Sequence, residues 1–387
     1  MKKYLCLVTI IFQFFGVTVQ FCAEYMYPVA TYNNEIVLFH QIDAEQTNLL
    51  LWNPETENLT SLLPAYFCPV NVKILPDNSG FSFIHHGRIH IKKWNSRSCR
   101  SINLFEPIYN IEQIEWLTSE ICYFHAKYGE HFGIYGADLS GKVICIIQKD
   151  SADCMYPQIK NEQLFYIERV NDPHKKASVH SVILNPAKML ETMNNDSNME
   201  LSFVDTEKTS IIFDNKQISE NLIFLTMIST KKGYVITYNP KIKHAQENID
   251  FSVYYITHQS DGWSNTKLFS FMLPLELING ENQYRLFESI VPCLPKWYKN
   301  IMYYVTTQKN DYFMESTLKK YDLNNNCSST IVHYKFNSLA TLLPPLHRDE
   351  ICVYGGTMGV DKTQYSLPFL YPFNDSYKAY VPVSIIP

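Results

Sequence analysis

The sequence lacks the features that mark several large classes of protein. After residue 23 no apolar run is long enough for a membrane-spanning helix, and no long amphipathic helix or alanine-rich run is present. Basic residues cluster only in short pairs, such as Lys92-Lys93 and Lys175-Lys176, and removing Lys2 and Lys3 lowers the basic count from 33 to 31 against 38 acidic residues. Because nucleic acid binding needs clustered Lys and Arg, we expect no nucleic acid partner and no membrane span after the N-terminal segment.

Motifs that carry known chemistry are also missing. No Cys-x-x-Cys occurs, and no paired spacing is typical of a zinc site. A nucleophile elbow would read Gly-x-Ser-x-Gly, but the nearest stretch, "GWSNT" from Gly262, lacks the second glycine. The repeats described below run to the end of the chain, so we expect no hydrolase domain after them. We therefore assign no catalytic residue, no metal ligand and no cofactor.

The first 23 residues have the pattern of a secretory signal peptide. Met1-Lys2-Lys3 supplies the positive start, and an apolar stretch follows from Tyr4 to Val19. Cleavage after Ala23 would leave residues 24–387 as one mature domain, either periplasmic or secreted. Two alternatives stay open: an uncleaved N-terminal anchor, and a lipoprotein attached through Cys22.

Cysteine usage agrees with export without defining a disulfide framework. Eight of the ten cysteines follow residue 23, which is sparse for a chain of 387 residues. Each of two pairs brackets one candidate repeat, so Cys68–Cys99 and Cys293–Cys327 are the expected bridges. The other cysteines are expected to be buried free thiols.

Composition favours an all-β fold. Aromatic residues make up 14% of the chain, with 27 Tyr and 23 Phe, and β-branched residues are frequent. Such side chains suit half-buried, pleated surfaces.

A short unit recurs along the chain. It consists of an apolar stretch, an Asn or Asp, two to four turn-forming residues and a second apolar stretch. Four copies are "NLLLWNPETENLTSL" from Asn48, "IHIKKWNSRSCRSI" from Ile89, "GIYGADLSGKVICI" from Gly133 and "STLKKYDLNNNCSSTI" from Ser316. An Asn or Asp side chain can fold back onto the backbone two residues later, so each copy predicts a hairpin. In the third copy Asp138, Ser140 and Gly141 therefore form a turn between outer strands, and residues 153–157 are expected to cross to the next repeat.

Another strand candidate precedes each hairpin and sets the period of the repeat. These candidates begin near residues 32, 72, 111, 156, 216, 293 and 343, which gives spacings of about 40 to 75 residues. Propeller blades have periods at the lower end of this range. We predict a single β-propeller of six or seven four-stranded antiparallel blades, with one blade shared between the chain ends if there are six. The alternative is two domains with a boundary near 185–210.

The repeat resembles that of the TolB-like propellers, a WD40-like (PD40-type) repeat family. The stretch "LPDNSGFSFI", with Pro76, Asp77 and Gly80, resembles their Pro-Asp-Gly turn before an apolar strand. The stretch "IYGADLSGKVICII" resembles the second half of their repeat. Two residues separate Asp77 from Gly80, and most copies lack the Pro-Asp-Gly turn. The resemblance covers most of residues 30–372 and implies a six-bladed periplasmic scaffold that binds other proteins.

Histidines and carboxylates supply the few candidate metal residues. The stretch "HHGRIH" contains His85, His86 and His90; Gly87 predicts a hairpin there, across which His86 and His90 could share a face. The stretch "DLNNNCSSTIVH" begins like a calcium loop at Asp322. It has Cys327 where glycine is required and His333 where a glutamate belongs, so a simple turn is preferred.

Two acidic residues beside tryptophans are candidates for a sugar-binding or sugar-cleaving cleft. These are Glu115 before Trp116 and Asp261 near Trp263. The competing interpretation is that both tryptophans belong to the core, as aromatic residues on propeller strands usually do.

The sequence therefore favours an exported, monomeric, non-enzymatic propeller that binds a protein, a small ligand or a saccharide. The alternative is a propeller enzyme of the glycosidase, lyase or lactonase type with its site at the central channel. A third hypothesis is a partner-docking platform held at the membrane by an uncleaved N-terminus. Fold alone decides among none of these.

Overall fold

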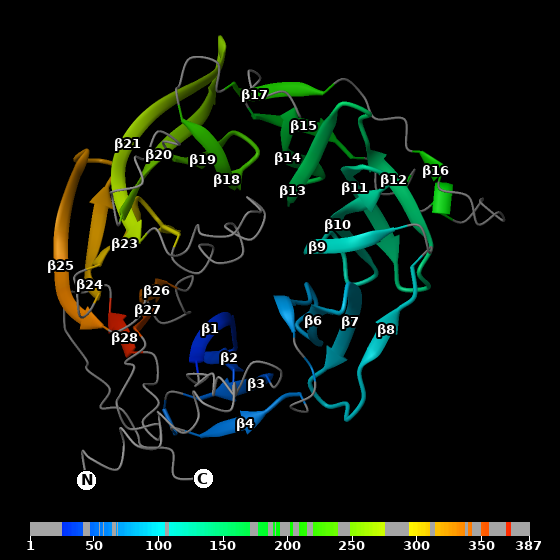
Figure 1. The fold of residues 1–387 in the computed structure, drawn as a ribbon, viewed down its shortest axis with the longest axis horizontal. Helices are drawn as coiled ribbons and strands as arrows, with labels where there is room; N and C mark the ends of the chain where they lie inside the picture. Colours follow the sequence, from blue (N-terminus) through cyan, green and yellow to red (C-terminus); the bar gives the residue numbers. More distant parts are fainter. Residues whose placement is uncertain are drawn as a thin grey trace, which may run out of the picture.

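The structure is a computed structural model, and it consists of β-sheets arranged in a ring (Figure 1). It describes residues 25–41, 47–53, 55–56, 58–63, 67, 69–104, 108–170, 177–184, 189, 191–193, 202–203, 209–214, 220–238, 248–274, 294–309, 314–336, 340–342, 350–355 and 369–372. The expected signal peptide, residues 1–23, lies outside these ranges and stays a prediction. In the described part of the chain, no helix is long and apolar enough to cross a membrane.

The sheets follow one another along the chain. The first contains β1 (Tyr25–Tyr32), β2 (Glu35–Gln41), β3 (Thr47–Trp52) and β4 (Leu59–Ser61). The second contains β5 (Val70–Ile74), β6 (Gly80–His85), β7 (Arg88–Lys93) and β8 (Arg100–Ile102). The third contains β9 (Tyr109–Trp116), β10 (Ile121–Tyr128), β11 (His131–Asp138) and β12 (Val143–Ile147). The fourth contains β13 (Ala152–Lys160), β14 (Gln163–Val170), β15 (Ser178–Ile183) and β17 (Ser210–Asp214).

Three further sheets complete the ring. The fifth contains β18 (Asn221–Ser229), β19 (Lys232–Tyr238), β20 (Asn248–Gln259) and β21 (Gly262–Pro274). The sixth contains β22 (Lys296–Tyr298), β23 (Ile301–Lys309), β24 (Met314–Asp322) and β25 (Cys327–Phe336). The last contains β26 (Ala340–Leu342), β27 (Glu350–Gly355) and β28 (Phe369–Pro372).

The predicted β-propeller of antiparallel blades is confirmed. Among the described residues, six sheets each contain four consecutive antiparallel strands, and the seventh contains three. Strand β26 contacts β23 on one side and β1 on the other, which closes the ring. The first sheet is built entirely from N-terminal strands, so the prediction of one blade shared between the chain ends is wrong for the described strands. Packing between β26 and β1 closes the ring instead.

A fifth strand joins the third sheet from outside. Strand β16 (Ser202–Phe203) comes from the segment between β15 and β17, and it pairs in parallel with Ile144 and Cys145 of β12. Met189, from the same segment, accepts a hydrogen bond at its sulfur from the Tyr123 hydroxyl at 3.2 Å. An insertion from the fourth blade therefore covers the outer strand of the third.

The core lies between neighbouring sheets. Ile84 and Ile89 of the second sheet pack in one cluster with Phe124 and Tyr135 of the third. A second cluster joins the third sheet to the fourth, and further clusters join the fourth to the fifth and the fifth to the sixth. The third, fourth and fifth blades therefore each have two buried faces, which accounts for their apolar runs.

The ring has two distinct faces. The link from Ile147, the last residue of β12, to Ala152, the first residue of β13, has five peptide steps and spans at most about 18 Å. Since β13 is about 30 Å long, this link is too short to run back along the blade. Strand β13 therefore starts on the side of the ring where β12 ends. This side, the crossover face, holds such links and the turns between second and third strands, as at His86-Gly87. The opposite side, the hairpin face, holds the first and last turns of each blade. These turns touch there: the Trp94 indole donates to the Asn78 carbonyl at 3.0 Å.

Three of the four recurring Asn and Asp residues form the side-chain hydrogen bonds that the sequence predicts for their turns. The Asp138 carboxylate accepts hydrogen bonds from the Ser140 and Lys142 amides at 2.8 and 3.0 Å. Asn53 and Asp322 likewise accept from the amides two residues on, at 2.9 and 2.8 Å. Gly141 completes its turn with φ of 93°, and a Cβ there would lie 1.9 Å from the Asn103 carbonyl oxygen.

Two sequence expectations are wrong. Residues 153–157 do not cross between blades, because they lie within β13, the buried first strand of the fourth blade. The Cys68–Cys99 and Cys293–Cys327 bridges are not formed, since Cys99 and Cys327 carry free thiols; Cys68 and Cys293 lie outside the described residues. Cys122, Cys145 and Cys154 are buried free thiols, as expected, and burial raises the pKa of Cys122 and Cys145 to about 12.

Replacing the turn aspartate should weaken the fold slightly and measurably. Asp138→Ala removes the acceptor for two amides and for the Ser140 hydroxyl, and we expect a loss of about 1 kcal/mol in the free energy of unfolding. Denaturant unfolding measures it. The matched control is Asn95→Ala, at the corresponding position of the second blade, because the Asn95 side chain makes no hydrogen bond to the described part of the chain. Equal losses in the two variants would contradict this account of the turn.

Candidate functional site

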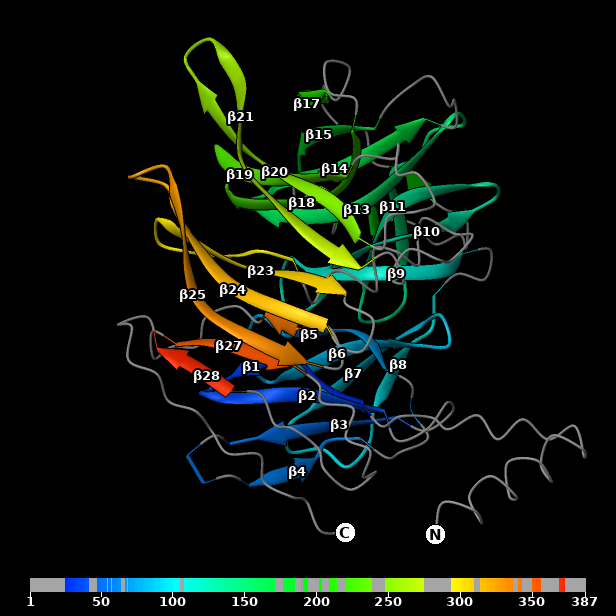
Figure 2. The same cartoon turned by 60° about the vertical axis from the view of Figure 1, so that its left-hand side comes forward.

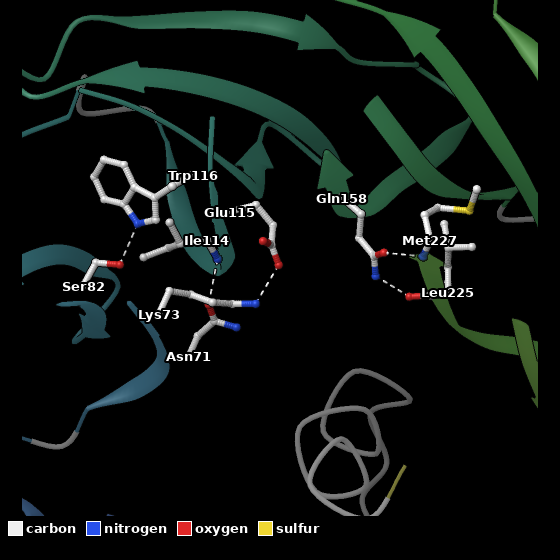
Figure 3. Close-up of polar contacts among 9 residues, drawn as sticks. All are labelled: Asn71, Lys73, Ser82, Ile114, Glu115, Trp116, Gln158, Leu225 and Met227. Carbon is white, nitrogen blue, oxygen red and sulfur yellow. Dashed lines mark hydrogen bonds and ion pairs between the residues drawn. The ribbon is translucent and has the colours of Figure 1, made fainter. Parts of the chain in front are cut away.

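The first strands of successive blades are joined by side chains rather than by a backbone ladder. Figure 3 shows the contacts between β5 and β9 and between β13 and β18. The Asn71 carboxamide oxygen accepts from the Ile114 amide at 2.8 Å. The Gln158 carboxamide accepts from the Met227 amide at 2.9 Å and donates to the Leu225 carbonyl. One amide side chain thus satisfies backbone groups of the following blade.

Bulges make these contacts possible. The register of the first strand shifts between Val70 and Lys73 in β5 and between Met155 and Gln158 in β13. Asn71 and Tyr156 adopt the left-handed region there, with φ of 50° and 58°. A bulge interrupts pairing inside its own sheet and redirects side chains. The redirected amides at these places reach the next blade.

An ion pair joins β5 to β9. Lys73 Nζ lies 2.6 Å from Glu115 Oε1, and the two side chains are 34% and 27% exposed. On the next residue, the Trp116 indole donates to the Ser82 hydroxyl at 2.8 Å. Glu115 therefore lies on a first strand, but its carboxylate is held by a lysine of the preceding blade.

A buried histidine connects the third blade to the fourth. His125 is fully buried, and its Nε2 lies 3.1 Å from Glu112 Oε2. Its Nδ1 accepts from the Tyr156 amide at 3.4 Å, which leaves Nε2 to donate to Glu112. Nearby, Asp153 accepts from the Phe132 amide at 2.9 Å, and its carboxylate lies 3.4 Å from His131 Nδ1.

A third carboxylate–histidine pair lies within the fourth blade. Glu168 Oε2 lies 2.5 Å from Lys149 Nζ and 3.3 Å from His180 Nε2. The Ser178 hydroxyl is 2.8 Å from the same imidazole nitrogen. Because serine and carboxylate share one nitrogen, this is not the geometry of a serine nucleophile and its base, in which they bind opposite nitrogens. Burial lowers the pKa of His180, although Glu168 acts in the opposite direction.

Glu220 is enclosed by hydroxyl groups of the fifth blade. Its carboxylate accepts from Ser252 at 3.0 Å, from Tyr254 at 3.4 Å and from Thr237. Lys267 Nζ lies 3.9 Å away. Burial, followed by the charge of Glu220, raises the pKa of Tyr254 to about 12. This carboxylate is fully engaged with its own blade.

Two large apolar side chains are exposed at the crossover-face ends of neighbouring first strands. Val70, the first residue of β5, is 44% exposed, and Tyr109, the first residue of β9, is 47% exposed. The Tyr109 hydroxyl donates to the Gly129 carbonyl in the turn between β10 and β11, which holds the ring in place. We call Val70 and Tyr109 the apolar rim.

The candidate histidines do not form a metal site. His85 lies on the same face as Phe83 and His90, with ring centroids of His85 and His90 5.7 Å apart, while His90 stacks on Phe83 at 5.1 Å. His86 occupies the turn with φ of 49°, and its ring lies against His85, with centroids 4.1 Å apart. In the described ranges, no three His, Cys, Asp or Glu side chains gather as a metal-binding group.

The other sequence candidates are separated in the structure. Asp322 and Cys327 flank the turn between β24 and β25, whereas His333 lies farther along β25 and contacts the Thr317 hydroxyl at 2.9 Å, so the simple turn is confirmed. Asp261 lies in the exposed turn between β20 and β21. Trp263 packs against His258, with ring centroids 5.2 Å apart, and against the core between the fourth and fifth blades.

Sequence reasoning missed most of the residues that link the blades. Asn71, Glu112, His125 and Gln158 belong to no local motif, and their partners lie far away in the chain. The available signal was indirect: polar residues interrupt first strands that are otherwise apolar.

Comparisons with known proteins bear on the fold. The sequence matches none of the family models and none of the curated proteins with which it was compared. Among solved structures, it is similar to a puromycin-hydrolyzing peptidase from Mycobacterium tuberculosis, with a TM-score of 0.60, 10% identity and coverage of 94% of this chain and 54% of that one. An oligogalacturonate lyase in complex with manganese matches with a TM-score of 0.53, 9% identity and coverage of 86% and 85%. TolB from Acinetobacter baumannii matches with a TM-score of 0.46, 10% identity and coverage of 82% and 66%.

The similarity to the peptidase and the lyase shows a shared β-propeller fold, which the resemblance in the sequence implied. The chain spans 54% of the peptidase and 66% of TolB. At identities of 9% and 10%, activity does not transfer with the fold.

Removing a link between blades should destabilise the ring. Gln158→Ala leaves the Leu225 carbonyl and the Met227 amide without their side-chain partner, and we expect a loss of about 1–3 kcal/mol in the free energy of unfolding. Gln163→Ala is the matched control, because Gln163 bonds to Ser181 within its own blade at 3.0 Å. Denaturant unfolding should show the larger loss for Gln158. The reverse order would count against the linking role.

Stability should fall as the pH drops below neutrality, partly through His180. The unfolded chain binds a proton at a histidine near pH 6.5, whereas the folded chain binds it at His180 only at lower pH, because burial lowers that pKa. Between these two pH values the unfolded chain takes up a proton that the folded chain does not, and this uptake favours unfolding. The stabilising contribution of neutral His180 is therefore present above about pH 6.5 and is lost as the pH falls below it. His180→Gln should flatten the decline in melting temperature between pH 7 and 5. His258→Gln, at the exposed end of β20, should leave the decline unchanged; an unchanged decline in His180→Gln would contradict the assignment.

Proposed function

We propose that this protein is an exported, monomeric, non-enzymatic propeller that binds a protein or another ligand at the crossover face. The proposal rests on a contrast among side chains of the first strands. Asn71, Lys73, Glu115 and Gln158 bond to neighbouring strands, whereas Val70 and Tyr109 of the apolar rim are exposed. Exposed aliphatic and aromatic side chains on a rigid frame are typical of binding surfaces.

Rigidity supports a binding role. Lys73, Glu115, Asn71 and Gln158 hold first strands of successive blades together, and the Tyr109 ring is fixed through its hydroxyl. A preorganised surface loses less entropy when a partner binds. The same bonds leave these groups less available for acid or base chemistry.

The signal-peptide pattern of residues 1–23 supports export, and cleavage after Ala23 would give a periplasmic or secreted protein. Finding Glu24 as the N-terminus of the mature protein by mass spectrometry would support this part of the proposal. An intact Met1 would favour the tethered docking platform instead.

A propeller enzyme of the lyase, glycosidase or lactonase type is the second candidate. It is favoured by the two carboxylates of β9, Glu112 and Glu115, which are both 27% exposed and lie beside His125 and Lys73. The structural similarity to an oligogalacturonate lyase makes oligogalacturonate the first substrate to test. Cleavage by the wild-type protein that is lost in Glu112→Gln or Glu115→Gln would favour the enzyme over the scaffold.

The apolar rim should determine partner binding. The purified mature protein is used as bait in the envelope fraction of its source cells, and the retained protein is then titrated against each variant. Val70→Ser combined with Tyr109→Ser should weaken binding at least tenfold, because both apolar contacts are lost. Ile183→Ser is the matched control, since Ile183 is 63% exposed on β15 in the outer half of its blade. Retention of no partner, or equal binding by the rim variant, would overturn the proposal.

A further inference from the structure

The outer strand of the fifth blade is unusually long. Strand β21 has 13 residues, whereas the outer strands β4 and β8 have three each. With β20 it forms a hairpin that projects beyond the neighbouring blades, at the upper left of Figure 2. Ser264, Asn265 and Thr266 near its tip are exposed. Natural sheets commonly protect their edges by keeping edge strands short, and β21 lacks this protection.

Two hydrogen bonds show which backbone groups of β21 point away from β20. The Met272 amide points away from β20, because it donates to the Thr306 hydroxyl of the sixth blade at 3.1 Å. At the other end of the hairpin, the His258 amide donates to the Lys231 carbonyl at 2.8 Å and therefore points away from β21. Trp263 lies opposite His258, so the two form a non-hydrogen-bonded pair, and the backbone N–H and C=O groups of Trp263 also point away from β20. Alternation then makes Asn265 the next residue with outward N–H and C=O groups.

These outward groups are open for pairing. Within the described ranges, the backbone N–H groups of Trp263 and Asn265 have no hydrogen-bond partner on the outer side. The register shift opposite Val253 and Tyr254 ends the regular stretch near Lys267. The available edge is therefore residues 263–266, which we call the β21 edge.

The same molecule already covers one outer edge by adding a strand. Strand β16 pairs in parallel with β12, where Ile144 is opposite Ser202 and Cys145 is opposite Phe203. Farther along β21, the Thr306 hydroxyl takes up the outward Met272 amide. At these two places, the outward backbone groups of an outer strand thus bond to a neighbouring segment or side chain.

We propose that the β21 edge binds an extended segment of a partner protein, which adds to the fifth blade as an outer strand. A row of alternating N–H and C=O groups is complementary to another extended backbone. Ser264, Asn265 and Thr266 are uncharged, and the Lys267 ammonium lies 3.9 Å from the Glu220 carboxylate. Backbone pairing therefore dominates recognition, and the bound segment is short, extended and free of proline.

This inference goes beyond the proposed function, because it adds a second contact surface. The apolar rim lies on first strands of the second and third blades, whereas the β21 edge lies on the last strand of the fifth. The two surfaces can be tested separately with different variants.

Site-specific photo-crosslinking tests the inference. Benzoylphenylalanine replaces exposed Ser264 in the full mature protein, which is irradiated with the envelope fraction of the source cells. We expect crosslinks to one continuous segment of one partner. The same probe at exposed Arg97, in the turn between β7 and β8, is the control for non-specific crosslinking.

Proline then distinguishes strand addition from side-chain contact. Asn265→Pro removes an outward N–H and leaves the pairing of β21 with β20 intact, so the crosslink yield should fall at least tenfold. Asn265→Ala keeps the backbone group and should stay within about twofold of the parent. Asn265→Lys, which places a charge on the edge without removing the N–H, provides a second blocking variant if the proline variant does not fold.

Three outcomes overturn the inference. The first is no crosslink at Ser264, and the second is a scattered set of crosslinks that matches the set from Arg97. The third is a crosslink yield that neither Asn265→Pro nor Asn265→Lys changes. If the bait retains a partner through the apolar rim but Ser264 forms no crosslink, the inference fails and the proposed function stands. If Ser264 crosslinks normally in a protein whose Val70 and Tyr109 are both serine, the rim is dispensable and the inference stands.

Discussion

Side-chain hydrogen bonds between the first strands of neighbouring blades are the interaction on which the ring depends. Adjacent blades face each other across buried apolar side chains, and among the described strands no backbone ladder joins the first strands of neighbouring blades. Bulges in β5 and β13 interrupt pairing within the sheet, and Asn71 and Gln158 then bond to backbone groups of the next blade. The Tyr156 amide, which donates to His125, makes a comparable link between the third and fourth blades.

This use of polar groups bears on function. A carboxylate on a first strand looks like a catalytic candidate when it is considered alone, yet Glu115 is paired with Lys73 and Glu112 with His125. The groups that could carry chemistry also hold the frame together, whereas Val70 and Tyr109 on the same two strands are exposed apolar side chains. A rigid ring that presents an apolar rim and an open strand edge is suited to binding. The lyase alternative depends on whether Glu112 or Glu115 can leave its partner when a substrate arrives.

The fold could be predicted from the sequence because each repeat contains a turn whose hydrogen bonds join residues close together in the chain. Asn53, Asp138 and Asp322 each bond to amides within a few residues, so turn chemistry is visible in a short stretch. The links between blades are not local: Gln158 and Met227 are 69 residues apart, and Lys73 and Glu115 are 42 apart. Bulges shift which face a side chain occupies, so strand alternation could not predict that Asn71 and Gln158 point to the next blade. The disulfide expectation failed for a similar reason, since bracketing a repeat in sequence does not bring two thiols together.

The central claim is that side chains, rather than a backbone ladder, hold neighbouring blades together near the axis. Native-state hydrogen exchange of the Ile114 and Met227 amides tests it most directly, because these amides donate to the Asn71 and Gln158 side chains. The account predicts that both amides exchange slowly in the wild-type protein. It further predicts that Asn71→Ala exposes only the Ile114 amide and Gln158→Ala only the Met227 amide. Rapid exchange at both amides in the wild-type protein, or protection that survives both substitutions, would contradict it.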